Sequence, residues 1–238
     1  MPLNHYERRY SVKYGHSFGI ITSRNASRQI FMIRTVSGRD AEERIQTIRQ
    51  LRHPNLAENV EIYTGSDPSH FVISEFMATS LLHLCRAPIY PNEPQLSSIL
   101  HQTHASVVFE VLTGLEFLLG HGLVYEQLSS VRVFVNFTGE VKIGDIDNCR
   151  RSGDMAALAM SFGRMTMKLM DKERVETASL GLTHPEKWSD EAIDMFTSIT
   201  TTPTIQKLLA HAFFSKKNQE ELVWLIPFVL ISARYDRE

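Results

Sequence analysis

The stretch "VYEQLSSVRVFVNFTGEVKIGDID" (residues 124–147) decides how the rest of the chain is interpreted. Val131, Val133 and Val135 recur at every second position, and "FTG" then turns the chain into "EVKIGDI". This period and this turn predict a β-hairpin. The hairpin leads from a short polar loop to Asp145, so the stretch has the frame of a functional site.

The segments before this hairpin are predicted to form strands. Short apolar or β-branched runs occur at residues 19–25, 29–36, 60–65 and 70–77. Between the second and third runs, "DAEERIQTIRQL" (40–51) places apolar residues three apart along one stripe, which predicts an amphipathic helix.

The segments around and after the hairpin are predicted to be helical. "HASVVFEVLTGLEFLLGHG" (104–122) has its apolar residues on one helix face, and "DMAALAMSFGRMTMKLM" (154–170) is apolar nearly all round, which predicts a buried helix. We therefore expect an α+β fold with two lobes. Residues 1–77 would form a small N-lobe with a five-strand sheet and one helix, and residues 78–238 a larger helical C-lobe.

Several of these segments resemble the eukaryotic protein-kinase fold in their order and spacing. "HFVISEFM" (70–77) resembles the family's fifth strand entering the hinge, and "GEVKIGD" (139–145) resembles the strand before its metal-binding Asp. "TIQKLLAHAFF" (204–214) resembles the family's closing helix. The resemblance extends over about residues 12–215, and the style of residues 88–102 is similar to fungal kinase-like proteins.

The resemblance assigns the catalytic loop to the polar residues at the head of the hairpin. Gln127 takes the place of the family's catalytic Asp, and its amide oxygen is a negligible base. Arg132 takes the place of the metal-binding Asn, and it stands 13 residues before Asp145, as that Asn does in the family. We expect no catalytic residue and no metal site here, only the degenerate equivalents Gln127, Arg132 and Asp145.

The resemblance also places two cations where the family has a Lys–Glu ion pair. Arg34 takes the place of the Lys on the third strand, and Arg44 takes the place of its Glu partner. Two such charges at about 4 Å repel by roughly 4 kcal/mol at an effective dielectric constant of about 20. We predict that Asp145 serves as the counter-ion of Arg34, in the position of the missing phosphates.

The nucleotide cleft implied by the resemblance is narrowed by bulky residues. Met32 and Phe134 take the positions above and below the adenine, and His16 replaces the middle glycine of the Gly-rich loop. We expect ATP binding to be weak or absent and Mg²⁺ not to bind. The implied cleft residues are Gly19, Ile21, Met32, Arg34, Glu75, Met77, Phe134 and Asp145.

The segment that follows Asp145 is much shorter than the activation segment that a kinase has at this place. A paired metal site of Asp145 and Asp147 is disfavoured, because alternate residues of a strand point to opposite faces. Residues 148–153 alone separate this motif from Asp154, which resembles the residue that opens the large buried helix. The activation segment and its Ala-Pro-Glu motif are therefore missing.

Together these losses predict a catalytically inactive pseudokinase that serves as an interaction, scaffold or regulatory module. One alternative is an enzyme, either a weak kinase acting through Arg34 and Asp145 or a transferase that holds its nucleotide in another orientation. The other alternative is a nucleotide-binding sensor. Mg²⁺-dependent nucleotide binding would favour the alternatives.

Composition limits the partners and the compartment. The 238 residues are 43% hydrophobic and carry a net charge of −2, which does not favour nucleic acid. Two cysteines suit a reducing compartment, so we expect a cytoplasmic or nuclear protein with no membrane span. We expect protein partners, such as an active kinase or a signalling protein. The apolar residues 222–231 offer a homodimer surface unless they pack onto their own lobe, and the break expected at Pro227 makes a single long helix lying on a membrane unlikely.

Overall fold

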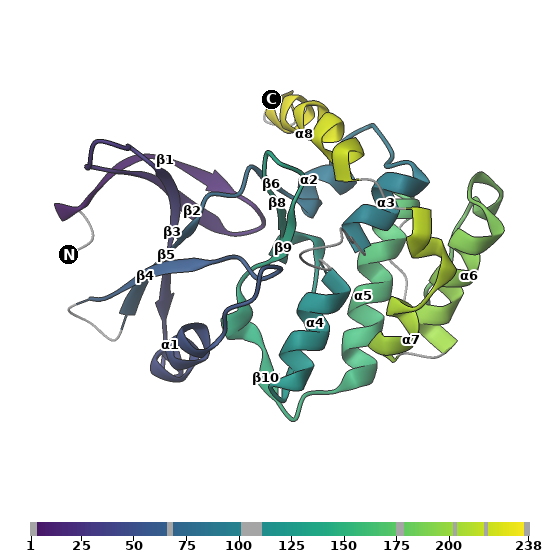
Figure 1. Ribbon diagram of the computed structural model, residues 1–238, viewed down its shortest axis with the longest axis horizontal. Coiled ribbons are helices and arrows are strands. Elements are labelled where there is room, and N and C mark those ends of the chain that lie inside the picture. The colour runs from purple at the N-terminus through teal and green to yellow at the C-terminus, as the bar shows by residue number, and fades with distance from the viewer. Residues whose placement is uncertain are drawn as a thin grey trace.

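The computed structural model describes residues 4–65, 69–100, 111–174, 179–201, 204–216 and 219–235. A sheet with one helix forms one end of the molecule and a helical lobe forms the other (Figure 1). This arrangement confirms the predicted α+β, two-lobed fold. The division of the chain at residue 77 stays a prediction.

The N-lobe is built on a five-stranded antiparallel sheet with the order β1-β2-β3-β5-β4. Its two faces bury different apolar residues, because neighbours in a strand point to opposite sides: Ile20 and Met32 lie on one face, and Ile21 and Ile73 on the other. Helix α1 packs against β3 and β5. The elements are β1 (Tyr6–Lys13), β2 (Ser17–Ser23), β3 (Ile30–Ser37), α1 (Ala41–Gln50), β4 (Asn59–Thr64) and β5 (Ser69–Glu75).

The C-lobe combines helices with short strands that shape the loop region between the lobes. The predicted hairpin is present as β8 and β9, which join β6 in a three-stranded sheet, while β7 pairs with β10. The first elements of this lobe are β6 (Thr79–Ser80), α2 (Leu81–Arg86), α3 (Glu93–Leu100), α4 (Val111–Gly120), β7 (Leu123–Val124), the 3-10 helix η2 (Ser130–Arg132), β8 (Val133–Val135) and β9 (Val141–Ile143). Part of the helix predicted over residues 104–122 lies outside the described residues.

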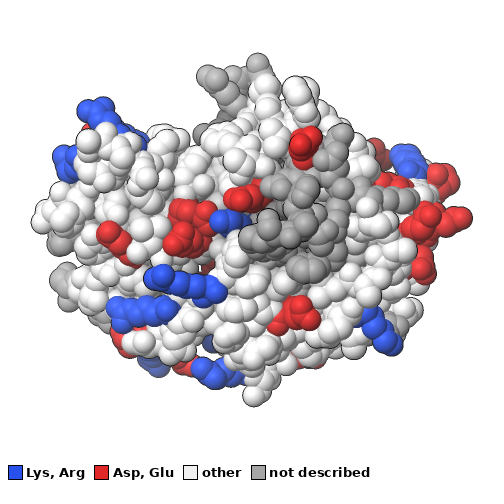
Figure 2. Space-filling model, in the orientation of Figure 1, with Lys and Arg blue, Asp and Glu red and all other residues white. Residues whose placement is uncertain are grey.

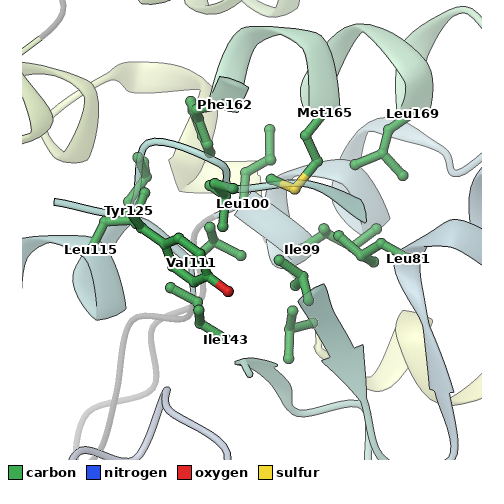
Figure 3. Close-up of a cluster of buried hydrophobic side chains, with 14 of the residues drawn as sticks. Leu81, Ile99, Leu100, Val111, Leu115, Tyr125, Ile143, Phe162, Met165 and Leu169 are labelled. Atoms are coloured by element: carbon green, nitrogen blue, oxygen red, sulfur yellow. The ribbon is translucent and has the colours of Figure 1, made fainter. Parts of the chain in front are cut away.

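The remaining elements complete the helical lobe. They are the 3-10 helix η3 (Ile146–Asn148), β10 (Arg150–Arg151), α5 (Met155–Met170), the 3-10 helix η4 (Pro185–Lys187), α6 (Asp190–Thr201), α7 (Ile205–Leu209), the 3-10 helix η5 (Ala212–Lys216) and α8 (Gln219–Tyr235). Phe162, Met165 and Leu169 of α5 point toward side chains from α2, α3, α4 and β9 in a buried cluster (Figure 3). The buried helix predicted over residues 154–170 is thus present.

Backbone hydrogen bonds also tie the two lobes together behind the cleft. The amide of Ile143 on β9 donates to the carbonyl of Asn55 at 2.8 Å, and the amide of Ala57 donates back to the carbonyl of Ile143 at 2.8 Å. The segment between α1 and β4 therefore extends the C-lobe hairpin by one short pairing.

The C-terminal helix α8 shows that the expected helix break at Pro227 is wrong. The helix runs through Pro227 from Gln219 to Tyr235. A proline costs a helix one hydrogen bond, and here α8 is held by packing on α2 and α3, with Leu222, Leu225 and Val229 buried.

The surface seen in Figure 2 carries basic and acidic side chains in mixed positions, with neither sign covering this face alone. Among the described residues, no helix is both long and apolar enough to cross a membrane.

Candidate functional site

The turn between β1 and β2 closes over the cleft and contacts the C-lobe. Gly15 has φ 97°, a conformation that other residues rarely adopt. A Cβ atom at Gly15 would come within 2.4 Å of the side chain of Val131, so the turn and the hairpin loop are in close contact. The next residue of the turn, His16, lies 3.4 Å from the carboxylate of Asp145.

Aromatic and sulfur-containing side chains fill the inner part of the cleft. The side chain of Tyr14 reaches across the cleft, and its hydroxyl donates to the carbonyls of Met77 at 3.2 Å and Ala78 at 2.8 Å. The amide of Met77 donates to Sδ of Met32 at 3.4 Å. The buried members of this apolar cluster are Tyr14, Phe18, Ile20, Met32, Met77 and Phe134.

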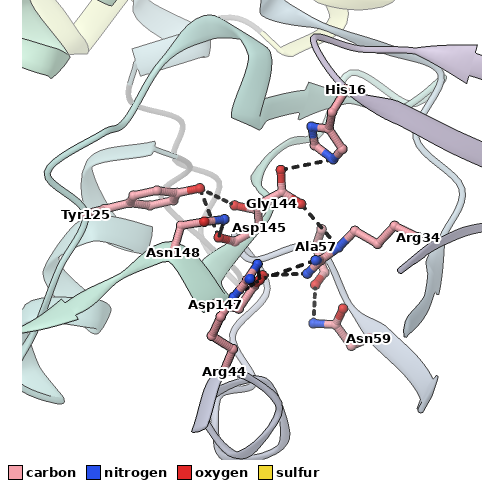
Figure 4. Close-up of polar contacts among 10 residues, drawn as sticks. All are labelled: His16, Arg34, Arg44, Ala57, Asn59, Tyr125, Gly144, Asp145, Asp147 and Asn148. Carbon is pink, nitrogen blue, oxygen red and sulfur yellow. Dashed lines mark hydrogen bonds and ion pairs between the residues drawn. The ribbon is translucent and has the colours of Figure 1, made fainter. Parts of the chain in front are cut away.

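A compact group of charged side chains fills the outer part of the cleft (Figure 4). Arg34 pairs with Asp145 through Nε at 3.2 Å, and with Asp147 through Nη2 at 2.5 Å. Arg44 from α1 binds the same carboxylate, with Nη2 at 2.5 Å and Nε at 3.1 Å from Oδ2 of Asp147. His16 lies at the rim, with Nε2 at 3.4 Å from Asp145. We call Arg34, Arg44, Asp145 and Asp147 the ionic cluster.

The aspartates of the ionic cluster compensate the repulsion expected between Arg34 and Arg44. The predicted pair of Arg34 and Asp145 is present, but Asp147 is the residue that bridges both guanidinium groups. Its side chain is fully buried, with 0% exposure. A buried carboxylate between two cations is favourable only when its oxygens are well paired, and here each oxygen accepts at least one short hydrogen bond.

The expectation that Asp145 and Asp147 face opposite sides is wrong. The alternation rule applies to an extended strand, whereas β9 ends at Ile143. Asp145 takes a left-handed conformation with φ 51°, and the 3-10 helix η3 follows it. This turn brings both carboxylates toward Arg34, and η3 packs against α1, which supplies Arg44.

The pKa shifts agree with a cluster that is charged in the folded state. Burial alone would raise the pKa of Asp147, but the charges of Arg34 and Arg44 and their hydrogen bonds outweigh it and lower this pKa below its usual value. Burial would likewise lower the pKa of Arg34, and the two aspartates raise it instead. At His16, burial lowers the pKa despite the nearby charge of Asp145.

The loop before the hairpin is held by Tyr125, whose role the sequence did not reveal. Its side chain is fully buried, and its hydroxyl donates to the carbonyls of Gly144 and Asp145, each at 3.0 Å. The guanidinium of Arg132 lies over the Tyr125 ring, 5.7 Å from its centre. Gln127 is exposed. Tyr125 thus fixes the backbone from which both aspartates project.

Comparison with known proteins identifies this arrangement. Residues 31–189 match the family described as protein tyrosine and serine/threonine kinase, which is more than half of the chain. The chain belongs to the protein kinase family. The predicted resemblance is confirmed, and the cleft between the lobes is the kinase cleft.

Individual relatives carry two kinds of name. The chain is 30% identical over 101 residues to the serine/threonine-protein kinase SSN3 of Phaeosphaeria nodorum, covering 42% of this chain and 22% of that protein. It is 29% identical over 100 residues to the TBC domain-containing protein kinase-like protein of Mus musculus, covering 42% and 10%. It is 24% identical over 155 residues to the serine/threonine-protein kinase max-2 of Caenorhabditis elegans, covering 62% and 23%. The matches thus span less than a quarter of each relative.

The kinase-family cleft residues expected from the sequence fall into two groups. Met32, Met77 and Phe134 lie in the apolar cluster, and Arg34 and Asp145 lie in the ionic cluster. The structure brings the first three together in one cluster and the last two together in the other.

The other three expected residues lie elsewhere. Ile21 packs with Tyr6 and Ile73 on the opposite face of the sheet, so Ile20 takes the place expected for it. Gly19 shares the face of Ile21 and lies against Ile33. Glu75 forms an ion pair with Lys142 at 2.9 Å and belongs to neither cluster. Strand alternation accounts for Gly19 and Ile21.

The segment after the ionic cluster is as short as predicted. Residues 150–151 form β10 and pair with β7 beside the catalytic loop. Asp154 then begins α5 as its N-cap, with its carboxylate accepting from the amide of Ala156 at 2.8 Å. The carboxylate of Glu126 accepts from the amide of Asp154 at 2.7 Å, so the loop is fastened to the start of the helix.

Proposed function

We propose that this kinase-family chain is a catalytically inactive pseudokinase that acts through protein interaction, as a scaffold or an allosteric regulator. The ionic cluster is the observation that carries the proposal. Asp145 takes the place of the family's metal-binding Asp, and it is paired with Arg34 at 3.2 Å, while the neighbouring Asp147 is paired with both Arg34 and Arg44 at 2.5 Å. The negative charge that would attract a metal ion is already balanced by the two arginines.

The chemistry of phosphoryl transfer supports the same proposal. The reaction needs bound metal charge, a clamp on the phosphates and a residue that orients the attacking hydroxyl. Gln127 supplies no base, and Arg132 adds positive charge to the side where a second metal ion would bind. None of the described residues forms a group of three or more His, Cys, Asp or Glu side chains suited to a metal ion.

Magnesium-bound ATP does not fit the residues of the cleft in this proposal. Entry of an adenine would require Tyr14 and Phe18 to leave the apolar cluster and would break the hydrogen bonds of Tyr14 to Met77 and Ala78. The triphosphate would then meet His16 and the closed turn at Gly15. We therefore derive no catalytic step through a nucleotide.

A radiolabel transfer assay with [γ-³²P]ATP tests the inactivity, with Mg²⁺ and Mn²⁺ in parallel and an Asp145→Ala variant as the matched control. We expect both proteins to give the same background signal. Transfer by the natural chain that disappears in the variant would overturn the proposal and favour the weak-kinase alternative. A thermal-shift titration with ATP addresses the sensor alternative: we expect no Mg²⁺-dependent rise in melting temperature.

The interaction role has a physical basis in the outer face of α8. Trp224, Phe228 and Ile231 recur at helical spacing and are 74%, 53% and 57% exposed. Apolar patches of this kind mark protein interaction sites. We propose a homodimer through this stripe, measured by size-exclusion chromatography with light scattering. A dimer that a Trp224→Ser, Phe228→Ser variant converts to a monomer is the expected result, whereas a natural chain that stays monomeric at high concentration rejects the homodimer.

A further inference from the structure

A small pocket on the C-lobe lies between the former catalytic loop and helix α5, outside both clusters of the cleft. Its volume is about 330 Å³, and it is lined by residues 127–132 on one side and by α5 residues on the other. Ligand pockets begin at about 300 Å³. This pocket is near that lower limit, so it suits a small chemical group rather than a whole nucleotide.

The lining of this pocket has one sign of charge. Arg132, Arg164 and Lys168 contribute three cations, and no Asp or Glu is among the lining residues. Arg164 and Lys168 are four apart on α5, so they share a helix face, where like charges destabilise each other. Glu126, which precedes the lining segment, directs its carboxylate to the amide of Asp154 instead. The pocket is therefore electrostatically prepared for an anion.

One guanidinium nitrogen of Arg132 lacks a hydrogen-bond acceptor among the described residues. Within the part of the chain that the structure describes, its Nη1 atom is buried and has no hydrogen-bond partner. This donor is shielded from solvent, so a bound anion would be attracted by the charge of Arg132 without a direct hydrogen bond to Nη1. Its remaining contact is with the face of the Tyr125 ring, which offers no acceptor oxygen in the plane of the guanidinium.

We propose that this pocket binds a phosphate monoester group. Two guanidinium groups and an ammonium group match the several oxygens and the double charge of such a group better than those of a carboxylate. Ser129 and Ser161 belong to the same lining, whereas the side chain of Ser130 is buried and hydrogen-bonded to Cys85. The site shares no residue with the ionic cluster, but Gln127 and Arg132 of its lining also stand in the former catalytic loop, so the test is made without nucleotide or divalent cations.

The test is isothermal titration calorimetry of the full chain, without nucleotide or divalent cations and at constant ionic strength. The probes are sodium phosphate, O-phospho-L-serine and L-serine, with sodium chloride as the blank. We expect saturable binding of the two phosphates and none of serine. Because Arg164 is exposed, Arg164→Gln should fold normally and weaken binding at least about fivefold, as should Lys168→Gln.

Arg49→Gln is the matched control, since it removes an exposed cation from α1 in the other lobe and should leave the affinity unchanged. A phosphoserine tripeptide that binds more tightly than inorganic phosphate indicates a phosphorylated partner segment as the source, and equal affinities indicate a free phosphate compound. The proposal is overturned if phosphate gives no more heat than chloride, or if Arg164→Gln and Lys168→Gln bind phosphate as the natural chain does.

Discussion

The inner and outer parts of the kinase cleft have been filled by opposite means. In the inner part, Tyr14, Phe18 and Phe134 occupy the space with buried apolar surface and a single hydroxyl. In the outer part, two arginines and two aspartates occupy it with buried charge. Apolar packing tolerates changes that conserve volume, whereas a buried charge requires every partner. The outer part should therefore be far more sensitive to single substitutions.

Asp147→Asn is expected to have the largest effect on stability. The change leaves the partly buried Arg34 and Arg44 next to each other without their shared counter-ion, and breaking a buried pair costs about 3–5 kcal/mol. Urea unfolding at neutral pH measures the loss. Asp145→Asn is the control, because it removes only one pairing with Arg34, at 3.2 Å, and should cost less. Equal or negligible losses for the two variants would contradict the bridging role of Asp147.

Acid should remove part of the same stabilisation. The pKa of Asp147 is lower in the folded protein than in the unfolded chain, where it is about 3.9. The unfolded chain then binds the proton more readily, so the contribution is complete above that value and is lost as the pH falls through the folded pKa. The stability difference between the natural chain and Asp147→Asn should shrink below about pH 4. A constant difference across that range would show that the charge of Asp147 is not what stabilises the cleft.

Tyr14→Phe examines the inner part, with a smaller expected effect. The ring stays in place, and only the hydrogen bonds to the carbonyls of Met77 and Ala78 are lost. We expect a loss of about 1 kcal/mol, the usual net value of such bonds. Tyr10→Phe is a matched control, because Tyr10 is 57% exposed. If Tyr14→Phe destabilised the protein as much as Asp147→Asn, the contrast between the two parts of the cleft would fail.

Trp224→Ser should have the smallest effect on the stability of the monomer. Trp224 is 74% exposed and lies on the outer face of α8, and surface substitutions usually change the free energy of unfolding by less than about 0.5 kcal/mol. Leu225→Ala, one residue further along on the buried face, should cost about 2–5 kcal/mol through the cavity it leaves. Similar losses for the two variants would mean that Trp224 is covered in solution.

Much of the fold could be predicted from the sequence because its signals are local. The strand periods, the apolar stripe of α1 and the nearly uniform apolar character of α5 each follow from side-chain spacing. Motif spacing also predicts which residues of the chain lie in the cleft. The pairing of Arg34 with Asp145 is predicted in this way and is present.

What could not be predicted depends on turns and on packing between distant segments. The position of Asp147 follows from the left-handed backbone of Asp145, which the strand pattern before it does not signal. The hydrogen bonds of Tyr14 join residues 63 and 64 positions apart in the chain. The continuity of α8 through Pro227 depends on contacts with α2 and α3 that override a local breaker.

The closed turn at Gly15 and the backbone pairing of Asn55 and Ala57 with Ile143 join the lobes at the front and the back of the cleft. A hinge-bending enzyme opens by separating such lobes, but here separation would break both connections and expose the ionic cluster. Amide hydrogen exchange measures the free energy of the opening that exposes each amide. Two lobes that open independently would give two different values of this free energy. The amides of Met32 in the N-lobe and Ile143 in the C-lobe should therefore exchange with the same free energy, through unfolding of the whole protein.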